Sequence, residues 1–298
     1  MLICSTMPFK SGFISIIGRP NVGKSTILNA MLGEKISIVS EKPQTTRNTI
    51  RGVKNIEDVQ IVFLDTPGIH EGGGLLNKFM VREATASLKD VDAVLFMVEA
   101  MHPPGGDDAL IIEALKRLKC PVVLAINKLD RVPKPALLPL IEQYSRLMDF
   151  KDIVPVSAIK GVGVPELEKV LCALLPEGPK YFPDDMVTDT PVRFLAGEIV
   201  REKVFQFTHN EVPYSVAVAV EKFEEKKALM SISAVINVER DSQKGIIIGK
   251  KGEMLKRIGT SARIDLEKLL ASKVYLELFV RVQKDWTRSP SSLKGFGY

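Results

Sequence analysis

The sequence predicts an α/β fold, in which a doubly wound sheet is followed by a smaller α+β domain. Short apolar runs alternate with helical patterns from Phe13 to Leu175, and this repetition is typical of βα units with helices on both faces of a sheet. A proline- and glycine-rich break stands at 176–179, where a linker is expected. Beyond it the elements follow in a different order, and the 298 residues suffice for about two domains.

The first half begins with the apolar, β-branched run 13–17, bounded by glycine, which predicts a buried parallel strand. Helical spacing follows over 25–32, and Gly33 is placed to end that helix. The other elements expected in this half are strands at 49–53, 59–64, 93–98, 122–126 and 153–156, and helices at 75–88, 109–118, 137–147 and 164–175.

The second half predicts a helix over 191–207, strands over 215–222 and 229–238 joined by the charged turn 224–227, a helix over 254–270 and a strand over 274–280. We expect domains at 1–178 and 191–288, a linker at 179–190, and a flexible Ser- and Gly-rich tail at 289–298.

Composition points to a cytoplasmic protein. Hydrophobic residues make up 45% and charged residues 26% of the chain, and its apolar runs fall short of the roughly 18 residues of a membrane span. The first ten residues are short and polar-interrupted, so we expect no secretory signal. Cys4, Cys120 and Cys172 lie far apart, as unpaired thiols in a reducing compartment do.

Charge is unevenly distributed. Residues 240–298 carry 13 Lys or Arg against 6 Asp or Glu, a net charge of +7, whereas the whole chain carries +5. This asymmetry favours a basic C-terminal region that binds a polyanion, although a charged surface kept for solubility is the simpler alternative.

A phosphate-binding loop is predicted between the first strand and the first helix. There the pattern G-x-x-x-x-G-K-[ST] lets backbone N–H groups and a helix N-terminus converge on a phosphate chain. Lys24 would reach the β and γ phosphates, and Ser25 would ligate magnesium; the alternative is an ordinary βα turn. In this loop the residues expected at the nucleotide are Gly18, Arg19, Pro20, Asn21, Val22, Gly23, Lys24, Ser25 and Thr26; further along the chain we expect Asp65, Thr66, Pro67, Gly68, Ile69, Asn127, Lys128, Asp130, Ser157 and Ala158 there.

Three further motifs follow: Thr45-Thr46 in a polar loop, then Asp65-Thr66-Pro67-Gly68 and Asn127-Lys128-Leu129-Asp130 at strand ends, with Ser157-Ala158 after them. Asp65 would face the magnesium through water, and the glycine run 72–74 suggests a mobile switch. Asp130 can accept hydrogen bonds from guanine N1–H and N2–H₂, which adenine does not present in that arrangement.

Together these motifs resemble a Ras-like guanine-nucleotide-binding domain. The resemblance implies that Asn127 contacts guanine N7, that the Lys128 stem covers the ring, and that the Ala158 amide, next to Ser157, meets O6. It also implies that Thr46, rather than Thr45, joins Ser25 on magnesium and senses the γ phosphate, which Gly68 senses through its amide. Loss of that phosphate would release both loops.

One position departs from the Ras-like pattern. Ile69 stands where a Ras-like enzyme has the glutamine that orients the attacking water. We therefore expect slow intrinsic GTP hydrolysis and another source of catalysis. By resemblance to potassium-dependent relatives, Asn21 could ligate K⁺ beside the phosphates; alternatively it is a simple turn residue.

The C-terminal basic segment contains Gly249-Lys250-Lys251-Gly252, which resembles the G-x-x-G loop of a KH domain of the prokaryotic, type II arrangement. Such a loop clamps about four nucleotides of RNA backbone, although a turn between elements would have the same sequence. We expect these four residues to contact RNA, because the two glycines allow the sugar-phosphate backbone to approach the loop closely.

The combination of Gln44-Thr45-Thr46-Arg47, Ile69 and a KH domain resembles the Era family of TrmE-Era-type GTPases, over nearly the whole chain. This resemblance implies a monomer that binds the 3′ end of small-subunit rRNA, captures RNA in its GTP state and assists subunit assembly, with weak membrane association possible. It adds Lys284 and Arg288 to the RNA candidates, with Arg257 on the preceding helix; Trp286 between them is expected in the core.

Two alternatives to RNA binding stay open. The basic helix, with Arg257, Arg263 and Lys268, could bind a protein or an anionic membrane surface, although the sequence has neither a glycine after Met1 nor a C-a-a-X box. The chain could also be a nucleotide-gated scaffold in which hydrolysis is only a timer.

Overall fold

The structure is a computed structural model that describes residues 8–70, 72–226 and 229–298. Its described residues form two compact units. The first contains residues 8–37, 46–70 and 80–189, and the second contains 38–45, 72–79 and 190–298. The end of the predicted linker therefore falls within one residue of the end of the first unit, and two short segments from the first half of the chain belong to the second unit.

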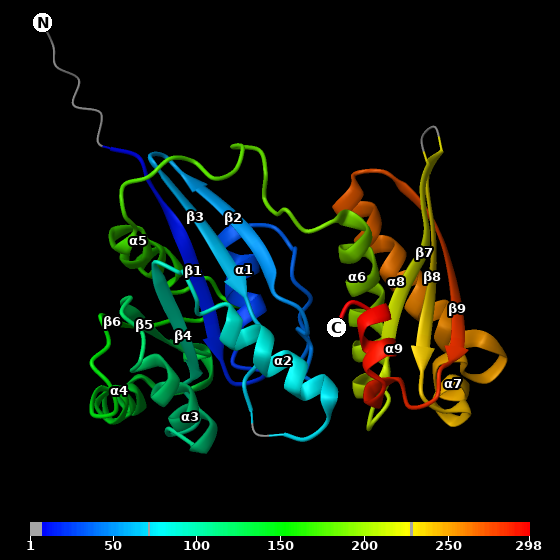
Figure 1. Ribbon diagram of the computed structural model, residues 1–298, viewed down its shortest axis with the longest axis horizontal. Helices are drawn as coiled ribbons and strands as arrows, with labels where there is room; N and C mark the ends of the chain where they lie inside the picture. The colour runs from blue at the N-terminus through cyan, green and yellow to red at the C-terminus, as the bar shows by residue number, and fades with distance from the viewer. Residues whose placement is uncertain (1–7, 71, 227–228) are drawn as a thin grey trace, which may run out of the picture. The chain divides into compact units, whose positions relative to one another are not determined.

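A six-stranded sheet in the order β2-β3-β1-β4-β5-β6 forms the centre of the first unit (Figure 1). Strands β1, β3, β4, β5 and β6 are parallel, and only the edge strand β2 runs antiparallel to its neighbour β3. The parallel strands are apolar over most of their length because both faces are covered. The strands are β1 Lys10–Gly18, β2 Ile50–Ile56, β3 Val59–Asp65, β4 Ala93–Glu99, β5 Val122–Asn127 and β6 Asp152–Pro155.

Helices cover both faces of this sheet, as the doubly wound prediction requires. On one face α1 (Lys24–Leu32) contacts α5 (Val164–Leu174). On the other, α3 (Gly106–Leu115) and α4 (Leu137–Ser145) pack on Phe96 and Leu124. Helix α2 (Leu75–Ala86) follows β3. The carboxyl ends of β1, β3 and β5 therefore meet at one edge of the sheet, which is where ligand groups gather in such folds.

The linker is tied to the first unit. The backbone N–H of Val53 on β2 donates to the carbonyl of Val187 at 2.7 Å, and Arg51 forms an ion pair with Asp189 at 2.5 Å. The buried Gln60 side chain accepts from the amides of Tyr181 and Phe182. These contacts make residues 181–189 an extension of the β2 edge instead of a loose tether.

The second unit contains the three-stranded sheet β7-β8-β9, with β8 central (Figure 1). Strand β8 pairs antiparallel with β7 and parallel with β9. Apolar residues of helices α6 and α8, such as Val200 and Ile258, join Ile236 of β8 in one core. The elements are α6 Val192–Phe207, β7 Ala217–Lys226, β8 Leu229–Val238, α7 Asp241–Ile248, α8 Glu253–Leu270 and β9 Lys273–Val282.

Two expectations for the second half are wrong, and one helix there was not predicted. Residues 224–226 lie in β7 and not in a turn, while residue 227 is outside the described residues. The stretch before Gly249 forms helix α7, capped by the Gln243 side chain, which accepts from the amides of Glu239 and Arg240. The tail forms helix α9 (Pro290–Gly295).

The tail is ordered because it covers Trp286. That indole is fully buried, donates from Nε1 to the carbonyl of Ser215 at 2.9 Å, and stacks with Tyr298 at a centroid distance of 5.9 Å. Phe296 meets it edge-on at 5.3 Å. Trp286 is thus the core aromatic that was expected.

No described helix is long and apolar enough to cross a membrane.

Candidate functional site: a nucleotide pocket and a G-x-x-G loop

The loop after β1 needs its glycines. Gly18 and Gly23 have positive φ angles of 159° and 102°. A Cβ atom at Gly18 would lie 2.3 Å from the Met97 carbonyl oxygen, and one at Gly23 would lie 2.2 Å from Nδ2 of Asn127. Any side chain at either position would therefore push the loop away from the strand ends.

Lys24 is the first residue of α1 and points back into this loop. Its Nζ donates to the carbonyls of Gly18 at 3.1 Å and Arg19 at 2.9 Å. Burial lowers the pKa of Lys24 to about 8, and Asp65 opposes this shift. A buried ammonium held by carbonyls is a strong binding group for phosphate, because phosphate adds the negative charge that the site lacks.

The hydroxyl groups of Ser25 and Thr46 lie 2.9 Å apart, beside Asp65. Ser25 and Ser37 both donate to Oδ2 of Asp65, at 2.7 and 2.6 Å. Burial raises the pKa of Asp65, while these two hydrogen bonds and Lys24 oppose the shift. By contrast, the Thr45 hydroxyl donates to the carbonyl of Lys42, so Thr46 and not Thr45 faces Ser25.

This oxygen cluster fits Mg²⁺. An octahedral Mg²⁺ holds its ligands at 2.0–2.1 Å, so neighbouring ligand oxygens are about 2.9 Å apart. Ser25 and Thr46 have that spacing. Asp65 accepts from Ser25 with Oδ2, and its buried Oδ1, which has no hydrogen-bond partner in the described part of the chain, can hold a metal-bound water. Although the residues that the structure describes contain no cluster of three or more His, Cys, Asp or Glu side chains, hydroxyl ligands of this kind suit a magnesium ion that is also bound by phosphates.

The segment Asp65-Thr66-Pro67-Gly68 lies against the phosphate-binding loop. The Thr66 hydroxyl donates to the carbonyl of Ile16 at 2.7 Å, and the Ile69 N–H donates to the carbonyl of Gly18 at 3.2 Å. A Cβ at Gly68 would lie 2.6 Å from the Pro20 nitrogen. The Ile69 side chain packs against the apolar core, so this position supplies no polar group to a water.

Asn127, at the end of β5, joins three parts of the pocket. Its Nδ2 donates to the carbonyl of Val22 at 2.8 Å, and its Oδ1 accepts from the Ala158 N–H at 3.0 Å. The next residue, Lys128, has a φ angle of 64°, which turns the chain so that Asp130 comes next to Ser157. The Ser157 hydroxyl donates to Asp130, and this bond lowers the pKa of the Asp130 carboxyl. An ionised carboxylate is the acceptor that guanine recognition requires.

Two supporting carboxylates were not predicted. Glu99 forms an ion pair with Lys128 at 2.5 Å. Burial acts to raise the pKa of Glu99, but Lys128 outweighs it and the pKa is lowered. Asp108, fully buried at the start of α3, pairs with Arg19 at 2.9 Å and accepts from the Tyr144 hydroxyl at 3.3 Å. Both acids lie far in sequence from the motifs they support, so spacing alone gives no signal for them.

The G-x-x-G loop connects α7 to α8. Gly249 and Gly252 have φ angles of 72° and 79°, and Lys251 has one of 52°. A Cβ at Gly249 would lie 2.7 Å from Cβ of Met254, whereas one at Gly252 would point into open space. Both lysines are exposed. The loop thus presents two charges and a bare backbone at the N-terminus of an 18-residue helix, where anions are favoured.

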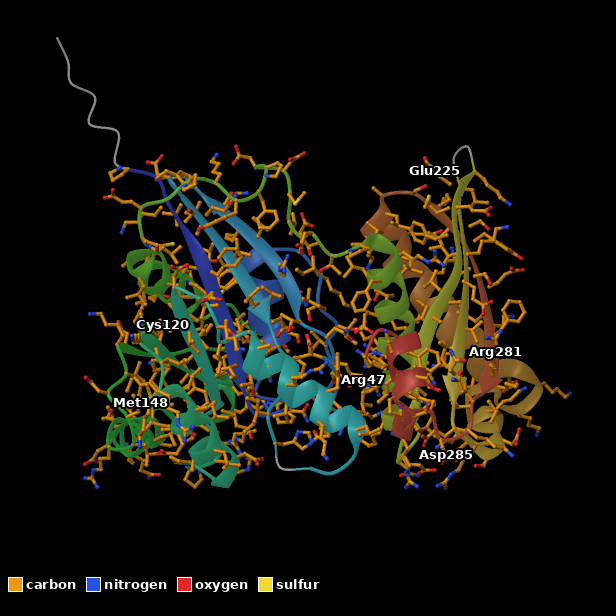
Figure 2. The ribbon with its side chains drawn as sticks, in the orientation of Figure 1. Arg47, Cys120, Met148, Glu225, Arg281 and Asp285 are labelled. Carbon is orange, nitrogen blue, oxygen red and sulfur yellow. The ribbon has the colours of Figure 1, made fainter. Side chains whose placement is uncertain are left out.

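The three other basic candidates lie outside this loop, and Arg257 is the nearest of them in sequence, on the second turn of α8. Arg257 is exposed on α8 and stacks on Phe207, with its Cζ 4.3 Å from the ring centroid. Lys284 and Arg288 are exposed and flank a segment tied to the start of α7, where Thr287 donates to Glu239 at 2.5 Å. Helix α7 separates that junction from Gly249 by about 12 Å along its axis. Figure 2 shows Asp285, the neighbour of Lys284 in sequence, at one end of the sheet and Glu225 of β7 at the other end.

The fold and the pocket define the class of protein, a guanine-nucleotide-binding domain with a phosphate-binding loop, followed by a KH-type domain. Two family models match the chain, "50S ribosome-binding GTPase" over residues 13–128 and "KH domain" over residues 211–287.

Relatives extend the match over nearly the whole chain. The GTPase Era of Geotalea uraniireducens is 58% identical and that of Geobacter metallireducens 56% identical, with 97% and 99% of this chain covered, and 98% and 99% of theirs. The chain belongs to the Era family of GTPases. Its fold matches a crystal structure of Era in complex with MgGDPNP and nucleotides 1506–1542 of 16S ribosomal RNA, with a TM-score of 0.95, 45% identity and coverage of 97% and 99%. It also matches a single-residue variant of Aquifex aeolicus Era bound to GDP·AlF₄⁻, with a TM-score of 0.94, 46% identity and the same coverage.

Proposed function

We propose that this chain is a GTP-hydrolysing switch that binds the 3′ end region of small-subunit rRNA and assists assembly of the small ribosomal subunit. The observation that carries the proposal is the presence, in one chain, of a guanine pocket and an exposed G-x-x-G loop, with a 45%-identical Era that was crystallised with both a GTP analogue and 16S rRNA. That complex favours the small subunit, although the matching family model is named for the 50S subunit.

In the proposed nucleotide cycle, Lys24 and the loop amides bind the phosphates, while Ser25 and Thr46 hold Mg²⁺ and Asp65 holds one of its waters. Magnesium supplies charge neutralisation at the β and γ phosphates. Asp130 selects guanine, and Asn127 keeps the base-binding and phosphate-binding parts at a fixed separation. The Ala158 N–H donates to Asn127 Oδ1 in this structure, so it would meet guanine O6 by leaving or sharing that acceptor. The γ phosphate would be sensed by Thr46 through the metal and by the Gly68 amide.

Hydrolysis would be slow without a further group, because Ile69 packs in the core and has no polar atom to orient water. We propose that K⁺ bound beside Asn21 contributes positive charge next to the phosphates and so partly compensates for the absent glutamine. Asn21 has a φ angle of 65° in the phosphate-binding loop. Turnover of GTP should therefore be faster in potassium than in sodium at equal ionic strength, and equal rates would remove the cation from the account.

In the RNA-binding step, Gly249 and Gly252 let the sugar-phosphate chain approach, and Lys250 and Lys251 supply charge. We propose that Arg257, Lys284 and Arg288 contribute longer-range attraction. We propose that the protein is a cytoplasmic monomer, in which any membrane contact would be an electrostatic one of the basic segment 240–298.

Crosslinking to an RNA that carries the 3′ end of 16S rRNA tests the proposal. Gly252→Asp places a carboxylate where a phosphate should lie, and we expect it to abolish the crosslink. Gly33→Asp is a matched control, because Gly33 has a similar φ angle of 74° and open space around it, at the end of α1. Undiminished crosslinking of the Gly252→Asp variant would overturn the RNA assignment.

A further inference from the structure

The segment 38–45, directly before Thr46, is held by helix α6 within the second unit. The Val39 N–H donates to Oε1 of Glu202 at 2.9 Å, and Nη2 of Arg201 donates to the Thr45 carbonyl. Lys42 donates from Nζ to the carbonyls of Phe205 and Thr208. Three successive parts of the segment are thus bound to one helix, and its last residue is the neighbour of the predicted magnesium ligand.

The two α6 side chains that hold the segment are buried. Arg201 is 0% and Glu202 1% exposed. Glu198 accepts from both Nε and Nη2 of Arg201, the former at 2.7 Å. A buried guanidinium needs acceptors for its donors. Glu198 accepts from Nε and Nη2 and the Thr45 carbonyl accepts from Nη2, while Nη1 is buried without a hydrogen-bond partner among the described residues, so the Thr45 carbonyl is one of the few acceptors that Arg201 has. Displacing Thr45 would leave a buried donor without that acceptor, which is costly.

Lys42 adds a second type of contact. Helix α6 ends at Phe207, and the last carbonyls of a helix have no partner within it. A lysine that donates to these carbonyls satisfies them and meets the negative end of the helix dipole. The contact is therefore specific to the end of α6, and it lies in the middle of the segment.

Glu202 also connects segment 38–45 to helix α8. Oε2 of Glu202 accepts from Lys203 Nζ at 3.1 Å, and this ammonium pairs with Asp265 of α8 at 2.5 Å. Helix α8 begins at Glu253, immediately after Gly252. The Glu202 carboxylate thus accepts from Val39 of segment 38–45 with Oε1. With Oε2 it accepts from Lys203, which pairs with Asp265 on α8, the helix that follows the G-x-x-G loop.

We propose that Arg201, Glu202 and Lys42 are positioning residues for GTP binding: they form a latch that holds segment 38–45 so that Thr46 lies beside Ser25. The Lys203–Asp265 bridge extends this latch to α8 and couples it to RNA. The second statement rests on the proposed RNA function, whereas the first concerns nucleotide alone. GDP lacks the γ phosphate that Thr46 would sense, so the latch should favour the GTP state selectively.

The first experiment measures affinities of the full chain for GDP and for a non-hydrolysable GTP analogue with Mg²⁺, in the absence of RNA. In Arg201→Lys and in the milder Lys42→Ala, we expect analogue affinity to fall by at least about fivefold, the lower end of usual coupling factors, and GDP affinity to stay unchanged. Arg193→Ala is the matched control, because Arg193 lies on the same helix but donates to carbonyls of β7. Equal loss for both nucleotides, or no loss, would overturn the latch.

The second experiment tests the bridge to α8. Asp265→Asn should leave both nucleotide affinities as in the wild type, because the α6 contacts with segment 38–45 remain. The ratio of RNA affinities in the analogue and GDP states should fall toward one. An unchanged ratio would overturn the bridge. Absence of RNA binding by the wild type would instead contradict the proposed function, and the nucleotide result of the first experiment would stand independently of it.

Discussion

The nucleotide pocket and the G-x-x-G loop differ in how their residues are held. In the pocket, nearly every functional side chain has a bonded partner from another strand end, as Asn127 does with Val22 and Ala158. In the loop, Lys250 and Lys251 are exposed and the glycines provide bare backbone. A rigid pocket suits a small ligand with fixed donors and acceptors, whereas an open loop suits a polymer that brings its own charge.

The largest expected effect is at the base-binding carboxylate. Asp130→Asn replaces an acceptor of two hydrogen bonds by an amide, so GDP affinity should fall by about 3–6 kcal/mol, from about 1.5–3 kcal/mol per charged bond. Titration with fluorescent GDP measures this, and xanthine nucleotide should bind the variant better than guanine nucleotide does. Unchanged guanine affinity would mean that the pocket does not read the base through Asp130.

Removal of the tail should affect only the second unit. Deletion of residues 289–298 uncovers Trp286 and removes its contacts with Phe296 and Tyr298. We expect about 2–3 kcal/mol less stability, from two aromatic pairs of about 1 kcal/mol each and lost apolar burial. Denaturant unfolding of the C-terminal unit measures the loss. An unchanged unfolding midpoint would mean that the tail does not stabilise the fold.

The loop lysines should act through charge alone. Lys250→Ala with Lys251→Ala should weaken RNA binding and reduce the slope of log affinity against log salt by about 1.4, since each single-strand phosphate contact contributes about 0.7. GDP affinity should not change. The control is Lys222→Ala with Lys226→Ala, which removes the same charge from exposed positions on β7. An equal reduction of the slope in the control would make the loop an ordinary charged surface.

A smaller effect comes from the buried ammonium of the pocket. The pKa of Lys24 is lowered to about 8 in the free protein, and bound phosphate raises it. The protonated form binds, so affinity is complete below pH 8 and falls as pH rises above it, by at most about tenfold per pH unit. GDP titrations from about pH 7 to 9.5 test this window around the lowered pKa, and a flat profile would mean that Lys24 stays protonated without ligand.

The sequence predicts the two regions unequally well. The pocket motifs can be recognised in the sequence because phosphate and base binding require particular residues at fixed spacing near strand ends. The structure brings Lys24, Asp65 and Asn127 together as expected. Spacing does not reveal Glu99 or Asp108, because their partners are distant in sequence.

Near the loop, helix α7 was missed because its Gly245 and three isoleucines are weak helix formers; packing of Ile247 in the core overrides that preference. The tail was expected to be flexible from its composition, and the aromatic contacts with Trp286 explain why it is not. The membership of segment 38–45 in the second unit follows from contacts with Arg201 and Glu202, about 160 residues away in sequence, and such pairing depends on tertiary structure.

The nucleotide pocket and the G-x-x-G loop belong, in our proposal, to one switch. The most direct test of this proposal is the affinity of the wild-type chain for an RNA that carries the 16S 3′ end, titrated at one salt concentration with GDP and with a non-hydrolysable GTP analogue. We predict that RNA binds more tightly when the protein holds the analogue than when it holds GDP. Because the coupling is reciprocal, RNA should raise the affinity for the analogue, relative to that for GDP, by the same factor. Equal RNA affinity in both nucleotide states would contradict the proposal.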